Sequence, residues 1–159
     1  MTTANRIVIT TATAARTRAL GRRIARLLRA GDVLLLQGPL GAGKTTFAQG
    51  IGAGLKVEGP VRSPTFVLMT RHGPAQAAAA AALPLYHADL YRLDEPEQVE
   101  ELALEEQARD GVLLVEWPER AGPGYWPQAL ALDLKIEADG SRSLTAGVPA
   151  AWKARWPLR

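Results

Sequence analysis

The sequence predicts an α/β fold with a mixed, partly parallel central sheet. Two unbroken apolar runs of strand length, Val33–Gln37 and Val112–Glu116, are typical of strands buried on both faces. Segments with helical spacing of apolar residues are interspersed with the strand-like runs. The pair Asp139-Gly140 separates the last two strand-like segments and predicts a hairpin, so part of the sheet is expected to be antiparallel.

The N-terminal third contains a strand, a helix and a second strand followed by a second helix. The run Arg6–Thr10, RIVIT, is expected to form a short strand, and apolar residues recur at helical spacing over Ala14–Arg29. Thr13 is the expected N-cap of that helix, and Gly31 marks its end. After the buried strand and a glycine-rich loop, Thr45–Leu55 is expected to form the second helix.

The rest of the chain is predicted from the same patterns. We find no repeat and no linker, and we expect one domain over residues 1–159. The last residues, with two tryptophans, are expected to close the fold as a short helix. The expected elements are strands at Phe66–Arg71, Ala129–Ile136 and Ser143–Val148, a strand that runs into a turn at Leu85–Leu93, an acidic helix at Pro96–Arg109, and a loop or hairpin insertion at His72–Pro84.

The composition is that of a soluble globular domain. Hydrophobic residues make up 47% of the chain and charged residues 22%. The absence of cysteine excludes a disulfide framework and a thiolate zinc site, and it agrees with an expected cytoplasmic location. We find neither a membrane span nor a secretion signal. The net charge of +3, mostly from arginine, leaves open a solvated surface or a partner that is acidic or a nucleic acid.

The segment Gly38–Thr45, GPLGAGKT, matches the phosphate-binding pattern G-x-x-x-x-G-K-[ST]. Glycines allow the backbone N–H groups to approach phosphate, and the positive end of the following helix faces the anion. Lys44 supplies a mobile charge for the β and γ phosphates, and the Thr45 hydroxyl is suited to bind Mg²⁺. An apolar strand before the loop and a helix after it are the context that the motif requires. The sequence therefore predicts a nucleoside triphosphate site in a three-layer, P-loop NTPase-like fold.

Hydrolysis also requires an acid near the metal ion or the attacking water. Glu116 ends the apolar run VLLVE, where the acid of such a fold is expected, at the carboxyl end of a sheet strand. An exposed glutamate at a strand end is the alternative. Trp117 follows directly, and its indole either stacks on a base or a partner or packs in the core or rim.

A second acid, Asp89, lies in the segment YHADLYRL among residues expected to be partly buried. A partly buried carboxylate needs a partner, which is either a metal ion or Lys44, or else Arg92. His87, two residues before, is expected to be a packed, hydrogen-bonded histidine rather than a ligand.

A short loop, Ser63-Pro64-Thr65, carries two hydroxyl groups after the second helix. In GTPase-like sites a hydroxyl at such a place senses the γ-phosphate. A turn that caps the next strand is the other interpretation.

Taken together, GPLGAGKTT, SPTF, YHADLYRL and VEW occur in an order and spacing that resemble the TsaE family, formerly YjeE. This family is the small ATPase of bacterial tRNA threonylcarbamoyladenosine synthesis. The resemblance covers about residues 20–120. The combination is specific, whereas the phosphate loop alone is not. The alanine-rich stretch Pro74–Pro84 lengthens a connection that is usually shorter in the family, and the family offers no match for Trp152 and Trp156.

The resemblance implies roles for individual residues. Lys44 and Thr45 match the phosphate and Mg²⁺ residues, Glu116 the metal-associated acid and Asp89 an acid linked to activity. Thr65 matches a switch-like threonine and Trp117 the tryptophan beside the acid. Adenine is expected near Thr10–Thr13. The implied catalytic residues are Lys44, Asp89, Glu116 and Thr65, the implied metal ligands are Thr45, Glu116 and Asp89, and the implied nucleotide-binding residues are Thr13, Gly38, Leu40, Gly41, Ala42, Gly43, Lys44, Thr45, Thr46 and Trp117.

The resemblance also implies ATP and Mg²⁺ as ligands and the proteins TsaB and TsaD as partners. In the family TsaD transfers threonylcarbamoyl to an adenosine beside the anticodon, and ATP hydrolysis by TsaE resets the complex. Hydrolysis is expected to be slow without the partners, because the chain has no obvious arginine finger unless Arg62 or Arg92 serves as one.

Two other functions use the same loop. A small-molecule kinase would need an arginine-rich lid and an acceptor pocket, and neither is a clear segment here, although Arg16, Arg18, Arg22 and Arg23 are close together. A binding module would hold the nucleotide without hydrolysing it. Adenine is expected over guanine only through the resemblance, since no N-K-x-D motif is present to argue for guanine.

Overall fold

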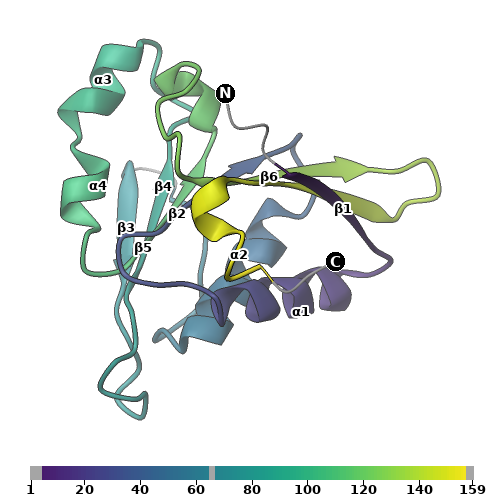
Figure 1. Cartoon of the computed structure of the whole chain (residues 1–159), viewed down its shortest axis with the longest axis horizontal. Helices are drawn as coiled ribbons and strands as arrows, with labels where there is room; N and C mark the ends of the chain where they lie inside the picture. The colour runs from purple at the N-terminus through teal and green to yellow at the C-terminus, as the bar shows by residue number, and fades with distance from the viewer. Residues whose placement is uncertain (1–4, 65–66, 157–159) are drawn as a thin grey trace.

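The computed structural model describes residues 5–64 and 67–156 and forms a seven-stranded mixed sheet flanked by helices (Figure 1). The strand order is β1-β7-β6-β2-β5-β4-β3. The central strands β6, β2, β5 and β4 are parallel, whereas β1, β7 and β3 pair antiparallel with their neighbours. The strands are β1 (Asn5–Thr11), β2 (Val33–Gln37), β3 (Met69–His72), β4 (Leu85–Asp89), β5 (Val112–Glu116), β6 (Leu130–Ile136) and β7 (Arg142–Val148).

Helices cover both faces of the sheet and make three layers. On one face α1 and α2 pack Ile24 and Phe47 against β2 and β5. On the other face, Val99 and Leu104 of α3 and α4 pack over β5 and β4. The helices are α1 (Ala14–Ala25), α2 (Lys44–Leu55), α3 (Pro96–Glu101), α4 (Leu104–Gln107), and the 3₁₀ turns η1 (Pro118–Ala121) and η2 (Ala150–Trp152). The predicted fold class, an α/β sandwich around a mixed sheet, is confirmed.

Glycines set how closely α1 approaches α2. A Cβ added to Gly50 of α2 would collide with the carbonyl oxygen of Arg18, and one added to Gly21 would lie 2.6 Å from the carbonyl oxygen of Phe47. The two helix backbones are therefore in direct contact. This contact fixes the start of α1 beside the loop that precedes α2.

Three predicted boundaries are wrong. The first helix ends at Ala25 rather than Arg29, because the N–H groups of Leu27 and Leu28 bond to the carbonyl oxygen three residues back instead of four. In the segment predicted over residues 85–93 the strand ends at Asp89, and the turn that the segment is expected to run into follows at residues 91–92. The strand expected at 66–71 is β3, which begins at Met69; Phe66 lies outside the described residues.

The third concerns the helix predicted over 96–109. It is interrupted at Ala103, whose φ of 47° is left-handed, so that Val99 before the break and Leu104 after it both face the same core. No helix in the described residues is long and apolar enough to cross a bilayer.

Candidate nucleotide-binding and hydrolysis site

The phosphate loop connects β2 to α2 at the carboxyl end of the parallel strands. Gly38 has a φ of 148°, and a Cβ there would lie 2.6 Å from the carbonyl oxygen of Leu134 in β6. Only glycine therefore lets the loop leave the strand in this direction. Gly43 is the N-cap of α2 and makes no side-chain cap bond, so the first N–H groups of α2 are left for an anion.

Lys44, the first residue of α2, is 8% exposed and lies against an aromatic ring. Its Nζ atom is 4.4 Å from the centroid of the Trp117 ring, a cation–π contact. Trp117 in turn packs on Tyr91 with 4.9 Å between ring centroids, and the Arg120 guanidinium lies 5.6 Å from the Tyr91 ring. The loop lysine is thus held beside the acid-bearing strand β5.

Glu116 ends β5 and is joined to the phosphate loop by a chain of hydroxyl groups. The Ser63 hydroxyl donates to Glu116 Oε2 at 2.8 Å, and Thr45 Oγ1 lies 3.2 Å from Ser63 Oγ. Because Ser63 uses its single hydrogen on Glu116, Thr45 must be the donor to Ser63. The lone pairs of Thr45 Oγ1 are then left for a cation.

His87 of β4 holds the other side of the same carboxylate oxygen. Its Nε2 atom lies 2.8 Å from Glu116 Oε2, and the imidazole is fully buried. A carboxylate only accepts hydrogen bonds, so His87 carries a hydrogen on Nε2. Both bonds end on Oε2, and within residues 5–64 and 67–156 no hydrogen bond reaches Oε1, which is the oxygen left for water or a metal ion.

These partners set the ionisation of Glu116. Burial by itself raises the pKa of the Glu116 carboxyl, but the hydrogen bonds from His87 and Ser63 and the nearby Lys44 outweigh it, and the net pKa lies below its ordinary value. Glu116 is therefore an anion at neutral pH although it is only 3% exposed.

Asp89 is the register partner of Glu116 across β4 and β5. Its Oδ1 accepts the N–H of Tyr91 at 3.0 Å. Burial first, and the neighbouring Glu116 carboxylate after it, raise the pKa of Asp89 above its ordinary value, against the lowering effect of the Tyr91 N–H, His87 and Lys44. Two carboxylates thus lie at the ends of adjacent strands, and one of them has a raised pKa. A bound cation would stabilise their ionised forms.

The donor set fits Mg²⁺. A threonine hydroxyl and two carboxylates are oxygen ligands, and Mg²⁺ usually keeps waters and substrate phosphates as its remaining ligands. In the described part of the chain no three His, Cys, Asp or Glu side chains cluster to form a complete metal cage.

A cavity of about 200 Å³ lies where the N-terminus of α1 meets the phosphate loop. It is lined by Thr13, Thr17 and Thr46, and by Gly140 and Arg142 of the β6–β7 hairpin. The Arg142 guanidinium donates to the carbonyl oxygens of Gly140, at 2.7 Å, and of Gly41, at 3.1 Å. The hairpin tip is thereby fastened to the phosphate loop and closes the side of the cavity where the sequence predicts adenine.

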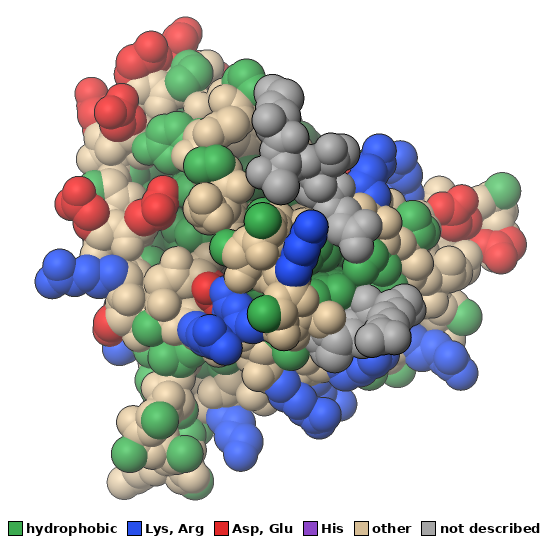
Figure 2. All heavy atoms as spheres, viewed as in Figure 1, with side chains coloured by type: hydrophobic (Ala, Val, Ile, Leu, Met, Phe, Trp, Pro, Cys, Tyr) green, Lys and Arg blue, Asp and Glu red, His purple; other side chains and the backbone are tan. Residues whose placement is uncertain are grey.

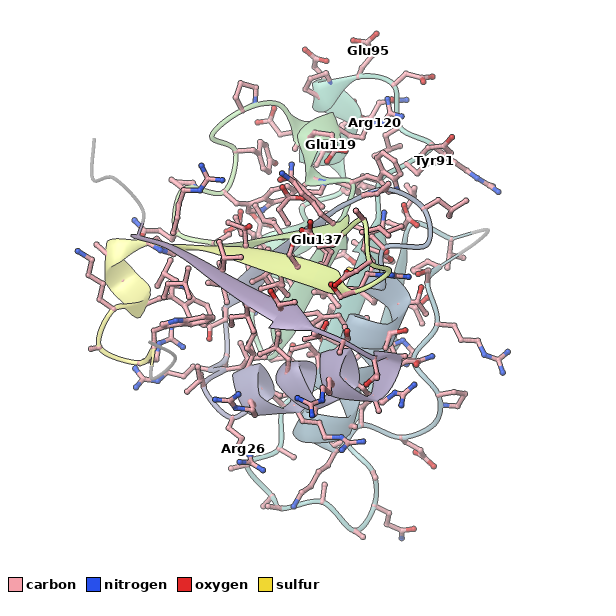
Figure 3. All side chains as sticks on the ribbon, turned by 90° about the vertical axis from the view of Figure 1, so that its right-hand side faces the viewer. Arg26, Tyr91, Glu95, Glu119, Arg120 and Glu137 are labelled. Carbon is pink, nitrogen blue, oxygen red and sulfur yellow. The ribbon has the colours of Figure 1, made fainter. Side chains whose placement is uncertain are left out.

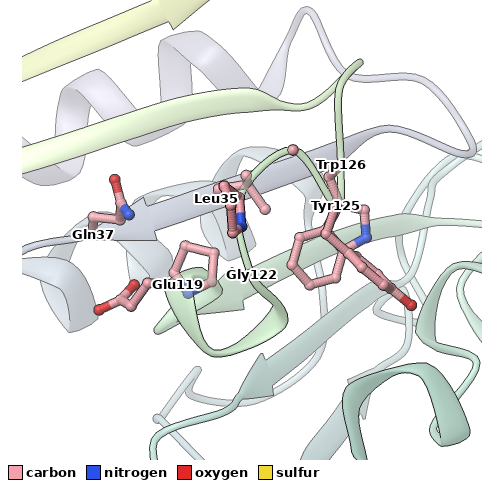
Figure 4. A pocket seen from close by; sticks show the side chains of 9 residues that line it. Leu35, Gln37, Glu119, Gly122, Tyr125 and Trp126 are labelled. Carbon is pink, nitrogen blue, oxygen red and sulfur yellow. The ribbon is translucent and has the colours of Figure 1, made fainter. Parts of the chain in front are cut away.

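A second cavity, of about 370 Å³, opens near the start of the loop but beside η1 (Figure 4). Tyr125 and Trp126 form an edge-to-face pair in its wall, and Gln37 and Glu119 lie at its far side. Its lining has neither a lysine nor an arginine. The smaller cavity, at the loop glycines, is thus the better match to a nucleotide.

The structure brings most of the predicted site residues together. Lys44 and Trp117 are in contact, Thr45 and Glu116 are linked through Ser63, and Asp89 pairs in register with Glu116. Thr13 caps α1 by accepting the N–H of Arg16 at 3.2 Å, as predicted. Leu40 is 93% exposed at the loop tip, so only its backbone is placed to bind a phosphate. Thr65 lies outside the described residues.

The sequence alone does not predict the role of Arg142, and it indicates Ser63 only as one of two hydroxyl-bearing residues in a short loop. The hairpin itself was predicted, but no sequence signal shows that its tip reaches a loop about a hundred residues away. His87 is packed and hydrogen-bonded, as expected, but its partner is the site acid itself.

Known proteins resemble the chain over most of its length. The model of the family described as threonylcarbamoyl adenosine biosynthesis protein TsaE matches residues 11–144. A protein from Streptomyces coelicolor, named tRNA threonylcarbamoyladenosine biosynthesis protein TsaE, is 48% identical over 103 residues, 64% of this chain and 67% of that protein. One from Mycobacterium tuberculosis with the same name is 44% identical over 106 residues, 63% of this chain and 61% of its own.

The match to these two relatives spans about two thirds of their length or less. A relative from Treponema pallidum, named in the same way, is 36% identical over 126 residues, 79% of this chain and 88% of that protein. The crystal structure of YdiB from Bacillus subtilis superposes with a TM-score of 0.72 at 30% identity, covering 96% of this chain and 92% of that one. The chain belongs to the TsaE family.

Proposed function

We propose that this protein binds ATP with Mg²⁺ and hydrolyses it in the biosynthesis of threonylcarbamoyladenosine in tRNA, together with TsaB and TsaD. Membership of the TsaE family supports the pathway. The observation that supports the chemistry is the chain from Thr45 through Ser63 to Glu116, which connects the phosphate loop to an ionised, buried acid. We further propose that residues 1–159 act as one ATPase domain in the cytoplasm.

ATP would bind along the loop and the cavity beside it. The N–H groups at the start of α2 and the Lys44 ammonium neutralise the β and γ phosphates. For this, Lys44 leaves the Trp117 ring or reaches the phosphates from it. The base enters the cavity between Thr13 and Arg142.

Thr45, Glu116 and Asp89 would hold Mg²⁺, which supplies positive charge to the oxygens of the transferring phosphate when bound. The Thr45 hydroxyl is oriented for this role because its hydrogen already points to Ser63. Burial, and after it the Glu116 carboxylate, hold the pKa of Asp89 above its ordinary value, and a bound cation would oppose both effects.

Glu116 would orient the attacking water and accept its proton. Its Oε2 is fixed by two donors, His87 and Ser63, while Oε1 has no hydrogen-bond partner in the described part of the chain. A carboxylate held by two partners cannot swing away, and such fixed orientation is what positions a nucleophile in line. His87 acts on the reaction through Glu116 and is a positioning residue.

The rim of the site supports a role for partners. Leu40, in the phosphate loop, is 93% exposed, and Tyr91, whose ring packs on Trp117, is 56% exposed. Exposed large apolar side chains at a site mouth are typical of a docking surface. A partner docked there would exclude water and supply the cation that accelerates phosphoryl transfer.

Reconstitution tests the proposal. TsaB, TsaD, tRNA, threonylcarbamoyl-adenylate and ATP are combined with this protein or with its Glu116→Ala variant, and modified tRNA and phosphate are measured over several turnovers. We expect repeated turnover only with the unaltered protein. Full turnover with Glu116→Ala would favour a binding module, and transfer of the γ-phosphate to a small-molecule acceptor would favour a kinase.

A further inference from the structure

The two helical layers carry opposite charge. Over residues 5–57 the sequence has nine Lys and Arg residues and a single acid, Asp32, whose carboxylate is paired with Arg155 at 2.6 and 3.0 Å. Over residues 94–110, which include α3 and α4, it has eight Asp and Glu residues and one arginine. Figure 2 shows Lys and Arg along the lower edge, where α1 lies in the same view in Figure 1. It shows Asp and Glu at the upper left, where α3 and α4 lie.

Most of the positive charge belongs to one helix. At 100° per residue, the arginines from Arg16 to Arg26 occupy an arc of about 160°, and the buried residues Thr17, Leu20 and Ile24 lie in the opposite arc. The other outward positions in the arginine arc are Ala15 and Ala19. We call this surface the arginine stripe; it consists of Arg16, Arg18, Arg22, Arg23, Arg26 and, just beyond the helix, Arg29.

The stripe has no acidic partner of its own. Within residues 5–64 and 67–156, none of its six guanidinium groups makes an ion pair, and all but Arg18 are exposed. Arg22 and Arg26 are four residues apart, a spacing at which like charges repel. Figure 3 places Arg26 and Glu95, one from each charged layer, at opposite ends of the molecule.

Helix stability explains only part of this pattern. Arg22 and Arg23 in the last turn interact favourably with the negative end of the helix dipole. Arg16 in the first turn has the opposite, unfavourable interaction, and the first turn contains no acid. The arginine stripe therefore lowers the stability of the free protein, and a bound polyanion would offset this loss.

We propose that the arginine stripe binds the phosphate backbone of RNA. The planar guanidinium binds phosphate with two parallel hydrogen bonds, which lysine cannot do, and the stripe contains no lysine. α1 is also rigid, because its backbone contacts that of α2 at Gly21 and Gly50. The choice of RNA among polyanions rests on the proposed role in tRNA modification, whereas the charge argument does not.

The stripe adjoins the nucleotide site. Thr13 and Thr17, at the start of α1, line the cavity beside the phosphate loop, and Arg16 lies between them in sequence. RNA bound along α1 would therefore end near the nucleotide. Acidic protein and a second copy of this chain, whose α3–α4 layer is acidic, are the alternative occupants.

The test is fluorescence anisotropy with a labelled tRNA transcript at 50–300 mM KCl, without nucleotide. The stripe variant is Arg22→Ala, Arg23→Ala and Arg26→Ala; the control variant, with the same change of net charge, is Arg109→Ala, Lys135→Ala and Lys153→Ala, all at exposed positions. Alanine keeps the helix propensity of α1. Circular dichroism and calorimetric ATP binding are measured on the same preparations.

We expect the stripe variant to lose at least about tenfold in affinity at 100 mM KCl, with a salt slope lower by about 3, and the control variant to change by less than about twofold. Equal losses in both variants, or no binding by the unaltered protein, would overturn the inference. So would a stripe variant that changes only self-association in sedimentation velocity or binding to an acidic protein such as poly-glutamate. If the unaltered protein did not bind ATP in the calorimetric titration, that result would instead contradict the proposed function.

Discussion

The Lys44 ammonium of the phosphate loop lies 4.4 Å from the centre of the ring of Trp117, the residue that follows the acid Glu116 at the end of β5. Trp117 has a left-handed backbone, with a φ of 57°, which costs about 1–2 kcal/mol for a residue other than glycine. This strained residue turns its ring toward the loop lysine. The lysine and the acid-bearing strand are thus coupled through one side chain.

Trp117 should report nucleotide binding. When phosphate attracts Lys44, the charge over the indole changes, and tryptophan fluorescence should change on adding ATP with Mg²⁺. We expect Trp117→Phe to abolish that change and Trp156→Phe to preserve it, because Trp156 packs against the core and is not among the residues that line the cavity beside the loop. An unchanged signal in Trp117→Phe would show that the cation–π contact is not part of the response.

Glu116→Gln should separate binding from hydrolysis. The amide keeps the shape and an oxygen that accepts from His87, but it cannot accept a proton. We expect calorimetric ATP affinity within a few-fold of the unaltered protein and phosphate release, with partners present, lowered by about 100-fold or more. Hydrolysis at the original rate would exclude Glu116 as the base.

His87 should matter through its hydrogen bond to Glu116. His87→Leu leaves a buried carboxylate without this donor and should lower the free energy of unfolding by about 1.5–3 kcal/mol, measured by urea denaturation. It should also lower the rate of ATP hydrolysis without raising KM. His87→Gln retains an N–H donor and should recover a large part of the rate. Equal rates in His87→Leu and His87→Gln would mean that the lower rate comes from altered packing rather than from loss of the hydrogen bond.

Asp89→Asn should stabilise the protein without nucleotide while reducing activity. The pKa of Asp89 is raised in the folded state, so the folded protein holds this proton more tightly than the unfolded chain does. The ionised group therefore destabilises the fold as pH rises through the folded pKa. We expect the Tm gain of Asp89→Asn to be full at pH 7 and to vanish below about 3.8, the ordinary value. A lower Tm at pH 7 would reverse this assignment.

The sequence predicted the parts of the site that are local in the chain. The glycine spacing of the phosphate loop and the strand before it lie in one short segment, and the acid at the end of VLLVE directly follows its own strand in another. The predicted order of strands and helices was sufficient to place Lys44 and Glu116 at the same sheet edge, because parallel strands end there together.

Contacts between distant segments could not be predicted. The bond from Ser63 to Glu116 depends on the path of the loop after α2, and the Arg142 bond to Gly41 on the register of the β6–β7 hairpin. The break at Ala103 has no sequence signal either, since residues 96–109 contain good helix formers and no internal glycine or proline. With the break, Val99 before it and Leu104 after it pack in the same buried cluster as β4 and β5.

The most direct measurement is calorimetric titration of ATP with Mg²⁺ into the unaltered protein and into Lys44→Ala, with circular dichroism to verify folding. The loop amides and the Lys44 ammonium are proposed to hold the phosphates together, and a hydrogen bond to a charged group contributes about 1.5–3 kcal/mol. We therefore predict that Lys44→Ala binds ATP at least about tenfold more weakly. Equal affinity in the folded variant would contradict the proposed nucleotide site.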